Sequence, residues 1–463
     1  MYVEQMYTGC LAEAAYYIES QGIAAVIDPL RDPEPYLKKA AERGATIQYI
    51  FETHFHADFV SGHLDLARET GATIVYGPTA KTGYIIHEAK DGEAFPIGAL
   101  TMVALHTPGH TPESTTWLLR DEQGADHAIF SGDTLFIGDV GRPDLAIKGD
   151  LTKEDLAGML FDSLQDKIKP LADHVKVYPA HGAGSACGKN ISSETESTVG
   201  DQRQNNYAMK ATSREAFVKE LTTGILPPPQ YFPKNAMINK QGYDALEGVR
   251  QSGQKALSVV EVEQALNEGA LLLDTRDSDS FHKEFIPGSV SIGLNGSFAV
   301  WVGTLITDLK RPIVLVADPN TEEQAVLRLA RVGYDKAIGY LDGGISAWKT
   351  AGNAVQSIRS IAPETLSKEL SEHPGAHLID VRKPGEFNNA HIEHSSNFPL
   401  DFINNRFQDI DLEGTYYLHC KSGYRSVVAA SIFRANGVQD VVNIEGGFDA
   451  LSELGFLVVE PVA

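Results

Sequence analysis

The sequence predicts an α/β protein of about three domains, and three observations lead to this prediction. At 463 residues, the chain is long enough for three domains of ordinary size. Its first half alternates strand-like apolar runs with helical ones and places metal-ligand side chains where strands end. Its second half contains two copies of one sequence pattern.

The composition is that of an ordinary globular protein, with 43% hydrophobic and 22% charged residues. A net charge of −23 argues against nucleic acid and anionic membrane surfaces as partners. No apolar run approaches the roughly 18 residues that span a bilayer, and residues 1–5 lack the features of a signal peptide. Three cysteines, Cys10, Cys187 and Cys420, cannot form a disulfide framework. We therefore expect a cytoplasmic protein with reduced thiols.

Residues 1–248 are expected to form the first domain, with two sheets flanked by helices and a site in the loops at one edge. The turn at Gln21-Gly22 predicts a strand pair, and Gly44 and Gly71 are expected to end helices. Strands are predicted over 16–18, 24–29, 47–51, 72–76 and 100–105, and helices over 35–43, 64–70 and 153–168.

The end of this domain is less regular in sequence. The Pro-rich segment 226–230, followed by 233–239, is either a linker or a cover over the substrate pocket. A polar connection, Gly248 to Lys255, is expected to lead out of the domain as a loop.

The first domain carries a pattern of potential metal ligands. The stretch Thr53–His63 reads T-H-F-H-A-D-F-V-S-G-H, and in an extended segment His54, His56 and Asp58 would project to one side. Three more apolar strands end in His110, Asp133 and His181. Imidazoles combined with carboxylates suit a borderline metal ion, so we predict a metal site.

The order H-x-H-x-D, then H, D and H resembles the metallo-β-lactamase superfamily, which implies an αββα sandwich. Hydrolytic members carry a second His directly after the motif Asp, where it helps to hold a second zinc. Phe59 occupies that position here and has no lone pair to offer a metal. A second site would retain His56, Asp58 and His181, with Asp133 as a bridge, which is an incomplete set. One metal on two His and one carboxylate is the facial arrangement of non-haem Fe(II) oxygenases.

The local motifs T-H-F-H-A-D, T-P-G-H-T-P, G-D-T-L-F, G-R-P-D and Y-P-A-H resemble the persulfide dioxygenase branch of this superfamily. That resemblance implies one Fe(II) per chain on His54, His110 and Asp133. His56, Asp58 and His181 would then orient ligands and water.

The same resemblance places further residues near the substrate. It implies roles there for Arg142, Asp144, Tyr178 and Arg203; the alternative for the first two is an exposed ion pair. Cys187 is either a second thiol that carries a persulfide beside the iron or a packed small residue.

The second half contains an internal repeat. Leu272–Arg276 recurs 106 residues later as Leu378–Arg382, and Leu341–Gly344 recurs 103 residues later as Ile444–Gly447. We predict two α/β domains, over 256–354 and 360–463. Their D-x-R, apolar strands and closing G-G resemble rhodanese (sulfurtransferase) domains.

The second copy carries the reactive residue types. A strand-like run ends in a loop that is followed by a predicted helix over 427–435; the loop is Cys420, Lys421, Ser422, Gly423, Tyr424, Arg425 and Ser426. At such a turn, backbone N–H groups, the helix dipole and nearby cationic side chains favour the thiolate. The C-x4-R spacing resembles rhodaneses, whereas tyrosine phosphatases use C-x5-R. We expect the loop to hold a persulfide sulfur on Cys420, or sulfite or thiosulfate; the alternative is a buried structural cysteine. Asp380 and Arg382 are expected to support the structure.

The equivalent loop of the first copy, Val316–Thr321, has neither a thiol nor the loop arginine. Persulfide transfer needs a nucleophilic sulfur, so this copy is predicted to be inactive. A spacer, a docking surface and an interface all remain open as its role.

Together the resemblances imply an enzyme that oxidises a low-molecular-weight thiol persulfide with O2 to sulfite. Cys420 would then pass a sulfur atom to sulfite and release thiosulfate. We expect small-molecule partners, no nucleic acid, no membrane and a homo-oligomer. One alternative is a zinc thioesterase of the glyoxalase II type fused to a sulfurtransferase. Another is a rhodanese pair that senses persulfides or binds a partner.

Overall fold

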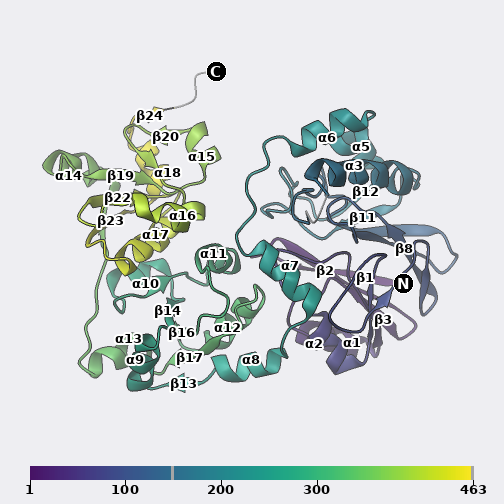
Figure 1. Cartoon of the computed structure of the whole chain (residues 1–463), viewed down its shortest axis with the longest axis horizontal. Coiled ribbons are helices and arrows are strands. Elements are labelled where there is room, and N and C mark those ends of the chain that lie inside the picture. The colour runs from purple at the N-terminus through teal and green to yellow at the C-terminus, as the bar shows by residue number, and fades with distance from the viewer. Residues whose placement is uncertain (147–150, 460–463) are drawn as a thin grey trace. The chain divides into compact units, whose positions relative to one another are not determined.

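The computed structural model describes residues 1–146 and 151–459 and divides into two compact units (Figure 1). The first unit comprises Met1–Leu246 with the short segment Ala330–Gly333, and the second contains the rest. In the described part of the chain, no helix is long and apolar enough to cross a membrane.

Two six-stranded sheets form the first unit, in the orders β1-β2-β3-β4-β5-β6 and β12-β11-β10-β9-β8-β7. The strands of the first sheet are β1 (Tyr2–Thr8), β2 (Glu13–Ser20), β3 (Ile23–Ile27), β4 (Thr46–Phe51), β5 (Thr73–Tyr76) and β6 (His87–Glu88). Those of the second are β7 (Ala94–Ile97), β8 (Leu100–His106), β9 (Thr115–Arg120), β10 (Asp126–Gly132), β11 (Lys176–Pro179) and β12 (Ser197–Thr198).

Alternating side chains of the strands form three apolar layers. Tyr16 of β2 and Trp117 of β9 lie in the core shared by the two sheets. The next residue along β2, Tyr17, packs outward against α1 and α2. Helix α3 and its neighbours cover the outer face of the second sheet. The predicted αββα sandwich is therefore confirmed. Its helices are α1 (Glu34–Arg43), α2 (His63–Thr70), α3 (Lys153–Ser163), the π-helix η1 (Leu164–Ile168), α4 (Val199–Asn205), α5 (Tyr207–Lys210), α6 (Arg214–Thr222) and α7 (Phe232–Gln241).

The predicted helix ends agree with the structure for a clear reason. Gly44 and Gly71 end α1 and α2 with φ of 62° and 70°, values that favour glycine. A capping box of Thr152 and Asp155 begins α3. The helix expected over 153–168 is continuous, but its last part is the π-helix η1.

The structure decides between the two alternatives for segment 233–239 and corrects the prediction for the connection after it. Segment 233–239 lies in α7, whose Asn239 is fully buried in the first unit, so this part is not a linker. The loop predicted over Gly248–Lys255 is wrong, because Leu246–Gly253 forms helix α8. Leu246 and Val249 are buried on one helical face, and a Cβ on Gly253 would lie 2.6 Å from Val326 Cγ2. This packing outweighs the low helix propensity of glycine.

The second unit contains two five-stranded parallel sheets, one in each copy of the predicted repeat. Their orders, β13-β17-β16-β14-β15 and β18-β23-β22-β19-β21, have the same topology. The first sheet contains β13 (Ala256–Leu257), β14 (Leu271–Asp274), β15 (Val290–Ser291), β16 (Ile313–Val316) and β17 (Ala337–Leu341). The second contains β18 (Arg359–Ile361), β19 (His377–Asp380), β21 (Ser396–Asn397), β22 (Thr415–His419) and β23 (Asp440–Ile444), and β20 (His391–Ile392) pairs separately with β24 (Val458–Val459).

Helices surround both sheets. Those of the first copy are α9 (Val259–Asn267), α10 (Ser278–Lys283), α11 (Phe298–Leu305), α12 (Glu322–Ala330) and α13 (Gly344–Thr350). Those of the second are α14 (Leu366–Glu372), α15 (Pro384–Asn389), α16 (Ile403–Arg406), α17 (Tyr424–Ala435) and α18 (Gly447–Glu453), with 3-10 turns at Pro363–Thr365, Leu400–Phe402 and Phe407–Asp409.

Candidate metal centre and cysteine loop

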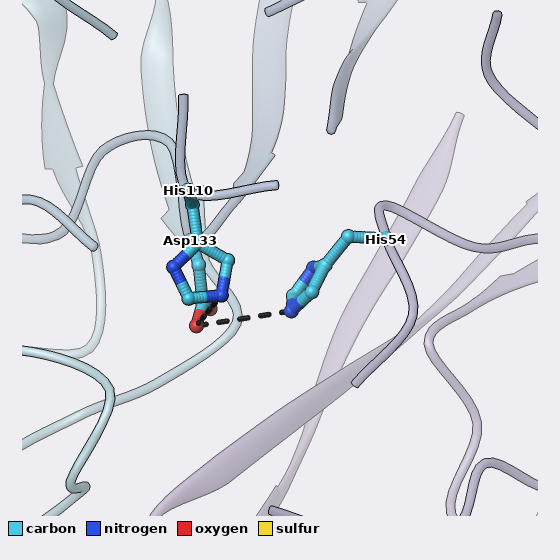
Figure 2. A group of neighbouring side chains, drawn as sticks. All are labelled: His54, His110 and Asp133. Atoms are coloured by element: carbon cyan, nitrogen blue, oxygen red, sulfur yellow. Dashed lines mark ion pairs between the residues drawn. The ribbon is translucent and has the colours of Figure 1, made fainter. Parts of the chain in front are cut away.

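Three strand ends of the first unit bring His54, His110 and Asp133 together (Figure 2). His54 Nε2 lies 3.8 Å from Asp133 Oδ2, and His110 Nε2 lies 3.4 Å from the same oxygen. One ligand atom from each residue falls within 4.8 Å of the others, and all three side chains are buried. This spacing suits one metal ion held on three sides.

The free atoms of this group fit a metal. His54 Nε2 and both carboxylate oxygens of Asp133 are buried without a hydrogen-bond partner among the described residues. Thr53 Oγ1 lies 2.9 Å from His54 Nδ1, and the Arg142 carbonyl lies 2.8 Å from His110 Nδ1. A histidine that donates from Nδ1 presents the Nε2 lone pair to a metal. Burial and the neighbouring imidazoles lower the pKa of His54 well below its usual value, so its ring is a neutral ligand.

His56 does not share this point with His54. The rings of His54 and His56 lie with centroids 4.2 Å apart, so they project to the same side as expected, but His56 and Asp58 belong to a second ligand group instead of meeting at one point with His54. His56 Nε2 lies 3.0 Å from Asp28 Oδ1 and 3.5 Å from Glu52 Oε2. Burial opposes its charge, but Asp28 and Glu52 raise the pKa of His56 to about 10. The buried ring of Phe59 packs against His56 with centroids 4.3 Å apart.

A second group of donors borders the first. His181 Nε2 lies 3.5 Å from Asp58 Oδ2 and 3.6 Å from Asp133 Oδ1. His56, Asp58 and His181 each offer a ligand atom within 4.8 Å of the other two. Cys187 forms a similar group with Asp133 and His181. Burial, then the charges of Asp58 and Asp133, raise the pKa of the Cys187 thiol well above its usual value.

Sequence reasoning missed three buried carboxylates beside these groups. Asp28 follows β3 and Glu52 follows β4, so both stand at the end of an apolar strand. A polar side chain after an apolar strand was the signal that pointed to His110 and Asp133, and this signal could also have identified Asp28 and Glu52. Glu13, on β2, is fully buried, and burial raises its pKa well above the usual range.

Arg142 supports the metal centre through its backbone and its side chain. Its carbonyl accepts from His110, and its guanidinium binds Asp144 and the carbonyls of Ala186 and Leu226. The Arg142–Asp144 pair is mostly buried, so the alternative of an exposed ion pair is wrong. A Cβ on Gly141 would lie 2.2 Å from the Asp133 carbonyl, and only glycine lets the loop approach the ligands this closely.

In the second unit, Cys420 stands directly after β22 and is 1% exposed. The Gly423 N–H donates to Cys420 Sγ at 3.1 Å, and Ser426 Oγ lies 3.7 Å from the same sulfur. Helix α17 begins at Tyr424, so the sulfur sits at the N-terminal end of a 12-residue helix. These donors suit a sulfur anion, as the loop predicts.

The closing G-G of the repeat supports this loop. A Cβ on Gly447 would lie 2.4 Å from the Cys420 carbonyl, and its φ is 59°. The next residue, Phe448, donates its N–H to the same carbonyl at 2.7 Å. Arg382 forms a buried pair with Asp380 and lies 3.9 Å above the Phe448 ring, which agrees with the supporting role expected for this pair.

The loop side chains differ in their accessibility. Lys421 and Ser422 are exposed. Arg425 is partly buried and forms two hydrogen bonds with Glu386, at 2.6 and 2.8 Å. The positive charge next to the sulfur is therefore balanced by a carboxylate that the sequence analysis did not single out.

Known proteins resemble both units. The family model described as Metallo-beta-lactamase superfamily matches residues 8–181, and that of the Rhodanese-like domain matches 258–351 and 362–454. A crystal structure titled metallo-beta-lactamase, from Staphylococcus aureus subsp. aureus COL, is 31% identical with a TM-score of 0.65; the match covers 74% of this chain and 98% of that one. The chain belongs to the metallo-beta-lactamase superfamily. Two rhodanese-like domains follow its metallo-beta-lactamase domain.

Other relatives match a smaller part of the chain. Hydroxyacylglutathione hydrolase of Acaryochloris marina is 35% identical over 165 residues, which are 35% of this chain and 60% of that protein. The chain thus spans less than two thirds of that relative's length. The structure titled ETHE1 from Myxococcus xanthus is 26% identical with a TM-score of 0.45, covering 52% of this chain and 98% of that one.

Two predicted residues of the metallo-beta-lactamase domain lie in other surroundings. The Tyr178 ring stacks on Phe130 in the core, and its hydroxyl lies 3.3 Å from Lys176 Nζ. Arg203 pairs with Asp173 and binds the carbonyls at the end of η1, which fixes that turn. Their proposed roles near the metal stay predictions.

The first rhodanese-like domain shows what replaces the cysteine. Val316 pairs with Asp274, as His419 pairs with Asp380 in the second domain. Ala317 therefore occupies the position of Cys420. The following helix, α12, begins with Glu322 and Glu323, whereas α17 begins with Tyr424 and Arg425.

Proposed function

We propose that the metallo-beta-lactamase domain is a persulfide dioxygenase that uses one Fe(II), and that the second rhodanese-like domain transfers sulfur to its product. The observation that carries the proposal is that two carboxylates outside the group of His54, His110 and Asp133 engage His56. Asp28 and Glu52 engage its imidazole, and Phe59 stands where hydrolytic members have a metal ligand. This arrangement favours one metal over two.

His54, His110 and Asp133 would hold Fe(II) and leave coordination positions open. A bound Fe(II) would supply a site at which O2 and the terminal sulfur of a persulfide meet. Thr53 and the Arg142 carbonyl fix the two imidazoles from behind. Overall, the persulfide RSSH, O2 and water give the thiol RSH, sulfite and two protons.

The neighbouring residues complete this site. Asp58 and His181 would hold water and orient it toward the ligand group. Cys187, beside Asp133 and His181, would touch the substrate. Arg142 and Asp144 would shape the pocket, because their pair also fastens the carbonyl of Leu226 from the Pro-rich segment.

The second rhodanese-like domain would use the sulfite. The Cys420 thiolate attacks the outer sulfur of a second persulfide, forms a Cys420 persulfide and releases RS⁻. Sulfite then attacks that outer sulfur, so thiosulfate leaves and the Cys420 thiolate returns. The Gly423 N–H, 3.1 Å from Sγ, would stabilise the anion at both stages. One chain carrying both sites raises the effective concentration of the sulfur intermediate.

A second candidate function is a zinc thioesterase of the glyoxalase II type. Two observations favour it: the curated relative named hydroxyacylglutathione hydrolase, and the group of His56, Asp58 and His181 within 4.8 Å. It requires His56 to leave Asp28 and bind a metal, which gives two metal ions per chain instead of one.

Oxygen uptake tests the choice. Protein purified without air, loaded with Fe(II) and given glutathione persulfide should consume O2, and His54→Ala should abolish both uptake and the single bound iron. Bound zinc at two ions per chain, with thioester hydrolysis and no O2 uptake, would establish the hydrolase instead.

A further inference from the structure

We propose that the thiol-free first rhodanese-like domain positions the reactive loop of the second by receiving the side chain of Tyr424. The inference rests on the proposed sulfur transfer and assigns a role to the copy that lacks the chemistry. Tyr424 is the first residue of α17 and directly follows Gly423, whose N–H binds Cys420 Sγ.

A hydrogen bond joins Tyr424 to the first rhodanese-like domain. Its hydroxyl donates to the Gly293 carbonyl at 3.1 Å. Burial raises the pKa of Tyr424, so the neutral phenol is the form that donates. Gly293 lies 131 residues earlier, just after β15, so this contact ties the two copies together at the loop.

Gly296 of the first rhodanese-like domain leaves space for the tyrosine ring, and Gly293 borders it. A Cβ on Gly296 would lie 2.6 Å from Tyr424 Cζ, and a Cβ on Gly293 would lie 3.6 Å from Cε2. Leu294, between them, is fixed within its own domain, since its N–H donates to the Thr275 carbonyl and its carbonyl accepts from Arg328. Hydrogen bonds within the first rhodanese-like domain therefore hold the backbone next to both glycines.

A second contact holds α17 further along. Ser431, seven residues after Tyr424, accepts a hydrogen bond from the Ser291 N–H at 2.9 Å in a buried position. Near the same boundary, Asn404 donates to the carbonyls of Thr304 and Leu305. Helix α17, whose N-terminal end lies at the Cys420 sulfur, is thus held to the first rhodanese-like domain at two points.

This geometry makes Tyr424 a positioning residue. A shift of its ring moves the adjoining Gly423 N–H, which is the backbone donor to the sulfur. Displacement by a fraction of an ångström weakens that hydrogen bond and leaves the fold of the second domain intact.

The test substitutes a residue of the first rhodanese-like domain and measures sulfur transfer by the second. In Gly296→Ala, the new methyl meets the tyrosine ring, and the kcat of thiosulfate:cyanide transfer should fall about tenfold with little change in KM. Gly248→Ala is the matched control, because a Cβ there meets no described atom within 4 Å. Tyr424→Phe, which removes only the hydroxyl, should lower kcat about threefold.

A double-mutant cycle separates positioning from a general structural defect. In a Tyr424→Ala background the ring is gone, so adding Gly296→Ala should have no further effect on kcat. The same fold-change in both backgrounds, or transfer by Gly296→Ala at the rate of Gly248→Ala, would overturn the inference.

The rate of Cys420 alkylation by iodoacetamide gives a readout that does not depend on sulfur transfer. Gly296→Ala should slow it about tenfold relative to Gly248→Ala, because the thiolate loses its backbone donor. If the wild type transfers no sulfur but this difference persists, the proposed function fails and the positioning stands. If transfer is present and alkylation is equal in both variants, the positioning fails alone.

Discussion

The two rhodanese-like domains share a scaffold and differ in the loop that it supports. Asp274–Arg276 and Asp380–Arg382 form the same buried pair, and each arginine also donates to a carbonyl eight residues on. The sheets have the same strand topology. Only the second copy has a thiol and a basic residue at the start of the following helix.

This difference teaches that the scaffold is retained where the chemistry is absent. In the first copy, Ala317 replaces the thiol, while the acid–base pair and the strands remain. The first copy also contacts the start of α17, a role that needs no sulfur. The following variants test the comparison, beginning with the largest expected effect.

The shared ion pair should matter equally for stability in both copies. Asp274→Asn and Asp380→Asn each leave a buried arginine without its partner, which should cost about 4 kcal/mol of unfolding free energy in the second unit. Urea unfolding measures this loss, with the exposed Asp342→Asn as control. Only Asp380→Asn should also lower sulfur transfer, because Arg382 packs on Phe448. A stable Asp274→Asn protein would show that the first copy no longer needs its scaffold.

Substitutions at the second glycine of the closing G-G should destabilise the two copies by different amounts. Gly447→Ala drives a methyl into the Cys420 carbonyl, so about 3 kcal/mol of stability and most of the transfer activity should be lost. In Gly344→Ala, at φ of 56°, no described atom lies within 4 Å of the added Cβ, so only about 1 kcal/mol of backbone strain is expected. Thermal unfolding and a transfer assay compare them. Equal losses would contradict the assignment of Gly447 to the loop.

One pH-dependent contact of the second copy has no counterpart at the equivalent residue of the first. Hydrogen bonds from Arg359 and Tyr417 lower the pKa of Glu369 from 4.5 to about 2. Because the pKa falls on folding, this contact stabilises the protein above pH 4.5 and is lost as the pH drops toward 2. The stability difference between wild type and Glu369→Gln should shrink over that interval. Glu263, 106 residues earlier, binds Asn353 instead. In Arg359→Gln, the effect of Glu369→Gln should keep only the smaller pH dependence that Tyr417 supplies; an unchanged dependence would refute the assignment.

Restoring the thiol to the first copy should have no effect. Ala317→Cys in a Cys420→Ser background places sulfur at the equivalent strand end, but the next helix begins with two glutamates. Negative charge at that point disfavours a thiolate, and the loop lacks an arginine. A thiosulfate:cyanide assay should remain at the background level. Measurable transfer would mean that the thiol alone separates the copies.

Much of the fold was predictable, because it follows from local signals. Glycines at helix ends gave the boundaries at Gly44 and Gly71, and the repeat gave two domains of equal topology. Helix α8 was missed because its glycines suggested a loop. The helix buries Val249 and brings Gly253 close to Val326, which is distant in sequence, and no local pattern contains that packing.

The candidate site was predictable where each side chain follows a strand. That rule places His54, His110 and Asp133 together, and it also applies to Asp28 and Glu52, which the sequence analysis passed over. The orientation of His56 was not predictable, because it depends on Asp28 from another strand as well as on Glu52, four residues earlier. Tyr424 belonged to the predicted loop, but its contact with Gly293 depends on packing between the two copies.

The central claim is that one chain divides persulfide oxidation and sulfur transfer between two sites. Product analysis with the Fe(II)-loaded Cys420→Ser protein, glutathione persulfide and O2 tests it most directly, with a protein-free reaction as control. We predict oxygen uptake at the wild-type rate, accumulation of sulfite, and thiosulfate only at the level of the control. Thiosulfate formed as fast as by the wild type would contradict the account.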